Sequence, residues 1–436
     1  MNQGERIMIK LTSIFILLFL FNVEGKESAD DPISAAARSY VKLALAVGEH
    51  DPAYIDAYFG PEEWKDEIKK QQLKLQEIAK TAELAIKALQ NLDASSFDPV
   101  TRIRHRHLVK QFESLLVRVQ LLEGKKLSFD DESLALYDAV APIHPESHFQ
   151  KILNQLEVLL PGKGSLNDRY TIFKQNFQIP KDKIDNVFQA AVAESRRRTK
   201  EHIDLPDHET FTIEYVSDKP WAGYNLFKGN GKSVIQLNVS LPVYIDSASD
   251  FACHEGYPGH HVYNVLREEE LLQKRKWVEF SIYPLFSPLA FISEGTAVYG
   301  IDVAFPGNER IAFETGVLFP LAGLDPAQAQ DYYKVKALTD QLSYAVNEAA
   351  RRYLNGKVSR EKTIEWLRQY AMMPSERANN RMQFIENYRS YVVNYNLGTD
   401  LVKKYIESKT ENTGDEKRWR EFEKLILTPV LPADLR

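Results

Sequence analysis

Three of the chain's ten histidines stand beside a glutamate in the octet His-Glu-Gly-Tyr-Pro-Gly-His-His at residues 254–261. Imidazole and carboxylate groups are ordinary zinc ligands, and a further carboxylate beside the ion can take a proton from water. In the common helical motif H-E-x-x-H, the two histidines are four residues apart and share one face. Pro258 occupies that fourth position here, so the octet is either a lengthened zinc motif or a chance cluster.

A straight helix cannot bring His260 or His261 to the same ion as His254. Six or seven residues advance a helix by about 9 to 10.5 Å, whereas a zinc–nitrogen bond measures about 2.0–2.1 Å. Pro258 and Gly259 predict a local widening of the helix, because proline removes a backbone donor and glycine accepts unusual dihedral angles. We predict that one later histidine returns to the metal. We favour His260, with His261 as the alternative ligand or as a neighbouring contact.

A third ligand is expected in the apolar segment 291–299, which contains one carboxylate, Glu294. A carboxylate buried in such a segment must be paired or bound to a metal. We predict that His254, one of the two later histidines and Glu294 hold Zn²⁺. Glu255 then stays off the metal and acts as the general base that activates water.

The two segments HEGYPGHH and SEGTAVYG resemble the bacterial domain of unknown function 885 family, which shows H-E-x-x-P-G-H-H followed by S-E-G-x-A-x-Y. The resemblance extends over about residues 30–410. The family is similar in its motifs to the gluzincin metallopeptidases, and dipeptidyl peptidase III also has a lengthened motif. The resemblance implies a mostly helical zinc hydrolase. Thr296 stands where the familiar form has tryptophan, which affects the pocket rather than metal ligation.

A hydrolase also needs donors that stabilise a developing oxyanion. The segment 387–398 is dense in such groups, and gluzincin-like enzymes use late Tyr, His or Arg side chains in this way. The alternative is that its tyrosines are core residues at helical spacing. The candidates are Tyr388, Arg389, Tyr391 and Tyr395.

Helical periodicity dominates the chain around these residues. We predict a mainly α (α+β) fold: a large helical, metallopeptidase-like domain with a small β-sheet next to the zinc-motif helix. Strands are expected at 211–216 and 234–239, with a turn and a possible hairpin at 229–231. The second strand either binds an extended substrate or is a purely structural sheet edge. Helices are expected at 32–47, 73–92, 101–122, 147–160, 180–202, 326–354, 362–370, 379–391 and 399–407.

The N-terminal residues 1–25 have the features of a secretory signal peptide, with Arg6 and Lys10 before the apolar run 11–21. No cysteine follows that run, so we expect no lipid anchor. We expect an N-terminal helical region at 26–200 and a catalytic zinc-binding region with the sheet and C-terminal helices at 201–425, in one continuous domain from about residue 30. The single cysteine excludes an internal disulfide.

The net charge of −6 indicates neither a nucleic-acid partner nor attachment to an anionic membrane surface after signal cleavage. We therefore expect an exported, periplasmic or secreted, zinc-dependent hydrolase, foremost a metallopeptidase acting on a peptide or small amide. The alternatives are a zinc hydrolase of non-peptide amides or esters, and an exported binding protein with a vestigial metal site. Oligomeric state does not follow from the sequence.

Overall fold

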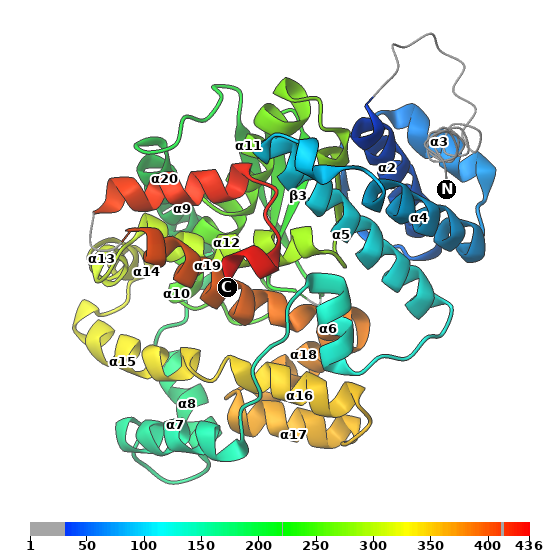
Figure 1. Ribbon diagram of the computed structural model, residues 1–436. Coiled ribbons are helices and arrows are strands. Elements are labelled where there is room, and N and C mark those ends of the chain that lie inside the picture. Colours follow the sequence, from blue (N-terminus) through cyan, green and yellow to red (C-terminus); the bar gives the residue numbers. More distant parts are fainter. Residues whose placement is uncertain (1–30, 220, 411–413) are drawn as a thin grey trace, which may run out of the picture.

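The computed structural model describes residues 31–219, 221–410 and 414–436, and the predicted signal peptide lies outside them. The molecule is mainly helical with two small sheets, which confirms the predicted fold class. Figure 1 shows helices α2 to α5 together at the upper right, with α12 and α19 near the middle. The N-terminal half contains helices α2 (Pro32–His50), α3 (Glu62–Gln71), α4 (Leu75–Gln90), α5 (Pro99–Leu122), α6 (Phe129–Tyr137), α7 (Glu146–Leu159), α8 (Leu166–Gln175) and α9 (Ile184–Lys200).

The C-terminal half carries the zinc motif and most of the remaining helices. Its helices are α10 (Asp246–Phe251), α11 (His260–Arg267), α12 (Pro288–Ala304), α13 (Glu309–Phe313), α14 (Phe319–Ala322), α15 (Ala329–Asp340), α16 (Tyr344–Leu354), α17 (Arg360–Tyr370), α18 (Ser375–Tyr388), α19 (Val393–Thr410) and α20 (Asp415–Leu427). The strands of the chain are β1 (Ile55–Tyr58), β2 (Thr210–Val216), β3 (Gly223–Gly229), β4 (Lys232–Asn238) and β5 (Ile282–Pro284).

Helix starts follow local chemistry that is visible in the sequence. Asp31, Asp98 and Ser287 each accept a hydrogen bond from the first turn of the helix they precede, and each is followed by a proline. A proline at this position has no amide hydrogen to leave unpaired, and such caps stabilise a helix by about 0.5–2 kcal/mol. The cap at Ser287 fixes the start of α12, which carries Glu294.

The sheet beside the zinc motif has three strands in the order β2-β4-β3. The turn at Asn230 and Gly231 joins β3 to β4, while β2 pairs with β4 in parallel. The turn and hairpin predicted at 229–231 are therefore confirmed, but the first arm of the hairpin is β3 and not the segment 211–216. The edge position predicted for 234–239 is wrong. Both sides of β4 are already paired, so no substrate strand can be added to it.

The predicted helix at 326–354 is interrupted. Helix α15 ends at Asp340 and α16 begins at Tyr344. Between them the amides of Leu342 and Ser343 bond to carbonyls three residues back, at 3.0 and 3.1 Å, as in a turn. The apolar stripe continues through the turn, which is why periodicity alone shows one helix.

Helices α12 and α19 cross at two glycines, and this crossing sets the geometry of the site. A Cβ atom on Gly295 would lie 2.6 Å from the backbone of Gly398. Only glycine permits this approach. Because Glu294 precedes Gly295 and Tyr395 lies one turn before Gly398, the crossing brings both toward the same space.

The larger apolar core draws on both halves of the chain. It includes Tyr40 and Phe112 from the N-terminal helices together with Phe291 and Val393 from α12 and α19. The boundary near residue 200 between the predicted N-terminal helical region and the predicted catalytic region stays a prediction. Within the part of the chain that the structure describes, no helix is long and apolar enough to cross a membrane.

Candidate metal centre

The octet at 254–261 contains the widened turn that the predicted metal motif requires. Residues Ala252–Gly256 form a π-helical turn, closed by the amide of Tyr257 on the carbonyl of Ala252 at 2.8 Å. Helix α11 then begins afresh at His260. A Cβ atom on Gly259 would lie 2.0 Å from the carbonyl oxygen of His254, so the chain folds back on itself backbone to backbone. This close return brings the second histidine beside the first.

His254, His260 and Glu294 converge. The Nε2 atom of His254 lies 3.5 Å from Oε2 of Glu294, and Nε2 of His260 lies 3.7 Å from Oε1 of the same carboxylate. Ligand atoms around a tetrahedral zinc ion with bonds of about 2.0–2.1 Å are about 3.4 Å apart. The two imidazole rings are 4.7 Å apart, centroid to centroid, and nearly perpendicular. The spacing therefore suits a small cation.

The hydrogen bonds around these groups leave the metal-facing atoms free. The Nδ1 atom of His260 is 3.1 Å from the Ser293 hydroxyl, which leaves Nε2 turned toward Glu294. The Glu294 atom Oε2 is buried without a hydrogen-bond partner. Such a buried carboxylate oxygen is costly unless a cation meets it. The donor set of two imidazoles and one carboxylate thus fits zinc.

Charge coupling inside the cluster is strong. Burial, together with the neighbouring His260, lowers the pKa of His254 to about 4. Burial also acts to lower the pKa of His260, but the Glu294 carboxylate outweighs it and the pKa rises to about 9. In return the two histidines hold the pKa of Glu294 below its ordinary value despite burial. The carboxylate is thus kept ionised, as a metal ligand must be.

Glu255 lies beside the same three groups. Its Oε1 atom is 3.9 Å from Nε2 of His254, farther than Glu294 is from either histidine. His254, Glu255 and His260 also each offer a ligand atom within 4.8 Å of the others. Burial raises the pKa of Glu255 to about 7. The Asn225 amide of β3 binds the Glu255 carbonyl at 2.7 Å, so the sheet supports this turn directly.

His261 faces away from the cluster. Its Nε2 lies 3.0 Å from a carboxylate oxygen of Glu209, and its Nδ1 lies 2.8 Å from the Ser233 hydroxyl. The ring is completely buried. Because both ring nitrogens are engaged behind the motif, the structure brings His260 and not His261 to Glu294.

The predicted oxyanion donors occupy different positions. The Tyr391 hydroxyl donates to Oε1 of Glu294 at 2.8 Å, which makes it an orienting group for that carboxylate. The Tyr395 ring stacks on His254, with centroids 6.5 Å apart. Tyr388 and Tyr395 line the cavity at the cluster, and neither hydroxyl has a hydrogen-bond partner among the described residues. They are therefore the free donors at this site.

Arg389 lies elsewhere, contrary to its predicted place in the site. Its guanidinium binds the Glu132 carboxylate at 2.7 Å, and the Ser390 amide and hydroxyl bind the same carboxylate. Arg389 adopts a left-handed backbone conformation, with φ of 53°, where α18 ends. This end of the helix turns its side chain out of the cavity and into an ion pair.

The cavity at the cluster, about 310 Å³ in volume, contains residues that sequence reasoning missed. Asp56 comes from β1, which pairs with β5 across the molecule, and burial raises the pKa of Asp56 to about 6. The Tyr224 hydroxyl lies 3.4 Å from the Asp56 carbonyl. Asn264 follows on α11, one turn after His260. Its position four residues after His260 is the one signal that could have been found in the sequence.

Comparison with known proteins shows a shared fold only. No family model and no curated protein matches the chain. Among solved structures, that of a candidate lipoprotein from Colwellia psychrerythraea aligns with a TM-score of 0.52 and 14% identity, over 95% of this chain and 76% of that one. A protein named CHT aligns at 0.45 and 12% identity, over 92% and 91%. A candidate lipoprotein of unknown function from Shewanella oneidensis aligns at 0.40 and 13% identity, over 98% and 91%.

Proposed function

We propose that this chain is a zinc-dependent hydrolase of the metallopeptidase type that cleaves peptides or small amides. The convergence of His254, His260 and Glu294 beside Glu255 in one cavity supports this most directly. These three residues would hold the ion. A bound zinc ion would act as a Lewis acid that polarises the substrate carbonyl and makes water more acidic.

The chain's own residues supply the remaining chemistry. Glu255 takes the proton from the attacking water and passes it to the leaving amine. The free hydroxyls of Tyr388 and Tyr395 donate hydrogen bonds to the carbonyl oxygen as charge develops on it. Tyr391 also lines the cavity, but its hydroxyl is already engaged with Glu294, so it positions that carboxylate.

Glu255→Gln tests the proposal. We expect zinc content to be unchanged and kcat on a fluorogenic peptide library to fall by about 10²- to 10⁴-fold, because only the proton acceptor is removed. Glu376→Gln, on the exposed start of α18, is the matched control and should retain activity. His254→Ala and Glu294→Ala should lose the metal. Loss of zinc in Glu255→Gln, or turnover equal to that of wild type, would contradict the proposal. A parallel panel of ester substrates tests the alternative, because hydrolysis of esters without hydrolysis of peptides identifies a non-peptide hydrolase.

We also propose that the chain is exported and belongs to the domain of unknown function 885 family. The signal-like residues 1–25 and the paired segments at 254–261 and 293–299 support these two statements. The lipoprotein description of the Colwellia psychrerythraea neighbour agrees with export. It also means that the expected absence of a lipid anchor stays a prediction. Mass spectrometry of the mature N-terminus decides both the cleavage site and the anchor.

A further inference from the structure

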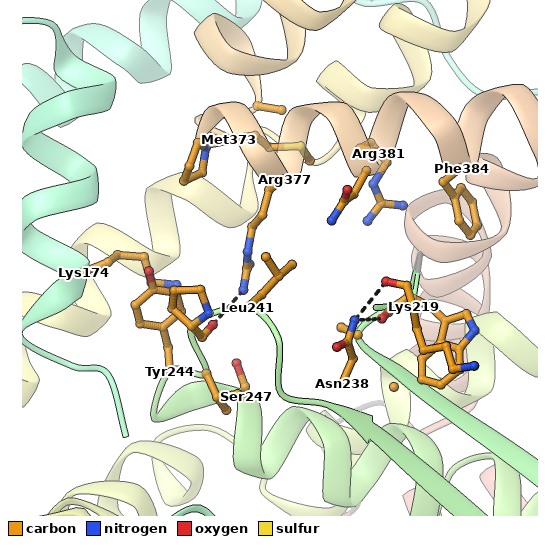
Figure 2. A pocket seen from close by; sticks show the side chains of 18 of the residues that line it. Lys174, Lys219, Asn238, Leu241, Tyr244, Ser247, Met373, Arg377, Arg381 and Phe384 are labelled. Carbon is orange, nitrogen blue, oxygen red and sulfur yellow. Dashed lines mark hydrogen bonds between the residues drawn. The ribbon is translucent and has the colours of Figure 1, made fainter. Parts of the chain in front are cut away.

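A second cavity of about 430 Å³ adjoins the metal centre (Figure 2). Helix α18 forms one wall, and the segment 237–247 forms the wall opposite. The two cavities adjoin, because several residues line both. The shared residues are Trp221, Gly223, His254, Glu255, Phe384 and Tyr395.

Four cationic side chains line this second cavity: Lys174, Lys219, Arg377 and Arg381. We call it the basic pocket. Among its described lining residues the only carboxylate is Glu255, which belongs to the metal end. The whole chain carries a net charge of −6, so the pocket reverses the sign of the protein's overall charge. Figure 2 shows Arg377 and Arg381 descending from α18 into the open space.

The two arginines of the basic pocket lack the counter-ions that buried arginines elsewhere in the described part of the protein have, whereas Lys174 interacts electrostatically with Asp246. Neither Arg377 nor Arg381 forms an ion pair with a described carboxylate, whereas Arg351 binds both Asp130 and Glu348. Arg377 instead donates to the Pro242 carbonyl at 3.3 Å.

Aromatic rings support the same cations. The guanidinium of Arg377 lies 5.6 Å from the Tyr244 ring centroid, and that of Arg381 lies 5.1 Å from the Phe384 centroid. Lys174 also lies over Tyr244, at 4.1 Å. Arg377 is exposed, whereas Arg381 is partly buried. A partly desolvated guanidinium without a counter-ion is costly, so a bound anion would remove that cost at Arg381.

The spacing on α18 places these charges along the path of a substrate. Arg377, Arg381, Phe384 and Tyr388 follow at intervals of four, three and four residues, so they share one helical face. Arg381 is seven residues from Tyr388, or about 10.5 Å along the helix axis. An extended peptide spans about 3.3–3.6 Å per residue. The backbone positions of Arg381 and Tyr388 are therefore separated by about the length of three extended peptide residues.

We infer that the basic pocket binds a carboxylate of the peptide substrate, about three residues from the scissile bond, and so selects acidic peptides. This inference rests on the proposed hydrolase function for its reference point at the metal centre. The planar guanidinium of arginine matches a carboxylate with two parallel hydrogen bonds. The carboxylate has two possible sources, an acidic side chain or the C-terminus of the peptide.

Two pairs of peptides with one common scissile bond separate these sources. The first pair carries Glu or Gln three residues from the bond, and the second ends there in a free carboxylate or an amide. Each is assayed with wild type, Arg381→Gln, Arg377→Gln and the charge-retaining Arg381→Lys. Arg368→Gln removes the same charge from an exposed site on α17 outside the pocket and is the matched control. Circular dichroism melting confirms that every variant folds.

We expect wild type to prefer one charged peptide over its neutral partner by about tenfold to hundredfold in kcat/KM, chiefly through KM, as one charge-assisted contact allows. Arg381→Gln should abolish that preference through a loss on the charged peptide that is larger than any change on the neutral one, while Arg381→Lys retains part of the preference. The preferred pair identifies the source of the carboxylate. Equal rates on both members of both pairs, or an equal loss on charged and neutral peptides, would overturn the inference.

Binding to the Glu255→Gln variant makes the test independent of turnover. Calorimetry with the same peptides should show tighter binding of the charged member, and loss of that difference when Arg381→Gln is added. If no peptide is hydrolysed but this difference persists, the proposed peptidase function fails and the basic pocket stands. If peptides are hydrolysed without any charge preference, the pocket inference fails and the hydrolase stands.

Discussion

Removing the Tyr391 hydroxyl tests whether Glu294 is a zinc ligand whose position is fixed by its neighbour. That hydroxyl donates to Oε1 of Glu294 at 2.8 Å, while Oε2 faces His254 at 3.5 Å. In Tyr391→Phe both carboxylate oxygens lose their fixed orientation, and Oε1 turns more freely toward His260. Loss of such an outer hydrogen bond weakens metal binding by about tenfold to hundredfold, or about 1.4–2.8 kcal/mol.

The assay is a zinc titration of metal-free protein against a chromophoric chelator of known affinity. The matched control is Tyr353→Phe, which deletes a hydroxyl that donates to Glu386 at 3.1 Å on the surface. That variant removes the same chemical group from the same kind of bond, away from the cavity. We expect its zinc affinity to equal that of wild type. A Tyr391→Phe affinity within twofold of wild type, or an equal weakening in the control, would refute the assignment of Glu294.

Three further predictions concern the structure around the site. His261→Ala should keep full zinc stoichiometry, as measured by atomic absorption. It should lower the unfolding free energy of the metal-free protein by about 1–3 kcal/mol, because the buried Glu209 loses a hydrogen-bond partner. Loss of the metal in this variant would instead make His261 a ligand. Gly295→Ala should destabilise the protein by about 1–3 kcal/mol in urea melts, because the new Cβ atom would lie 2.6 Å from the backbone of Gly398. Gly316→Ala is the control and should leave the stability unchanged, because a Cβ atom at Gly316 meets no other atom within 4 Å. Burial, aided by Arg267, lowers the pKa of His107 to about 3 in the folded protein, so unfolded chains take up the proton first as pH falls below 6.5. The uptake of this proton should lower the unfolding free energy by about 2 kcal/mol as the pH falls from about 7.5 to 5. His107→Asn should lose that share of the pH dependence. An identical dependence of the unfolding free energy on pH in wild type and variant would contradict this prediction.

The convergence of His254 with a later histidine could be predicted in large part because its constraints are local. The distance that separates His254 from His260 on a regular helix is incompatible with one ion, so a widened turn had to lie between them. Pro258 and Gly259 mark its place, and the structure has a π-helical turn followed by a new helix there. The same reasoning favoured His260 but left His261 as an alternative. That choice depends on Glu209, which comes from a segment fifty residues earlier.

Other parts of the site depend on pairings that no local pattern contains. Asp56 reaches the cavity because β1 pairs with β5, more than 200 residues later in the chain. Strand β3 has glycine at both ends and no clear alternation, so its place in the sheet depends on pairing with β4. Arg377 and Arg381 differ, because their spacing from Tyr388 is visible in the sequence. The spacing does not show which segment lies opposite α18. Only that opposite segment turns this face of the helix into the wall of a cavity.

The backbone contact at Gly259 has a consequence for the choice of metal ion. The separation of His254 and His260 is set where main chain meets main chain, so side-chain repacking cannot adjust it. An ion with longer bonds and more ligands, such as calcium, requires the chain itself to open. At the proposed zinc site, discrimination between ions would therefore arise from the steric rigidity of one glycine as much as from the softness of the imidazole nitrogens.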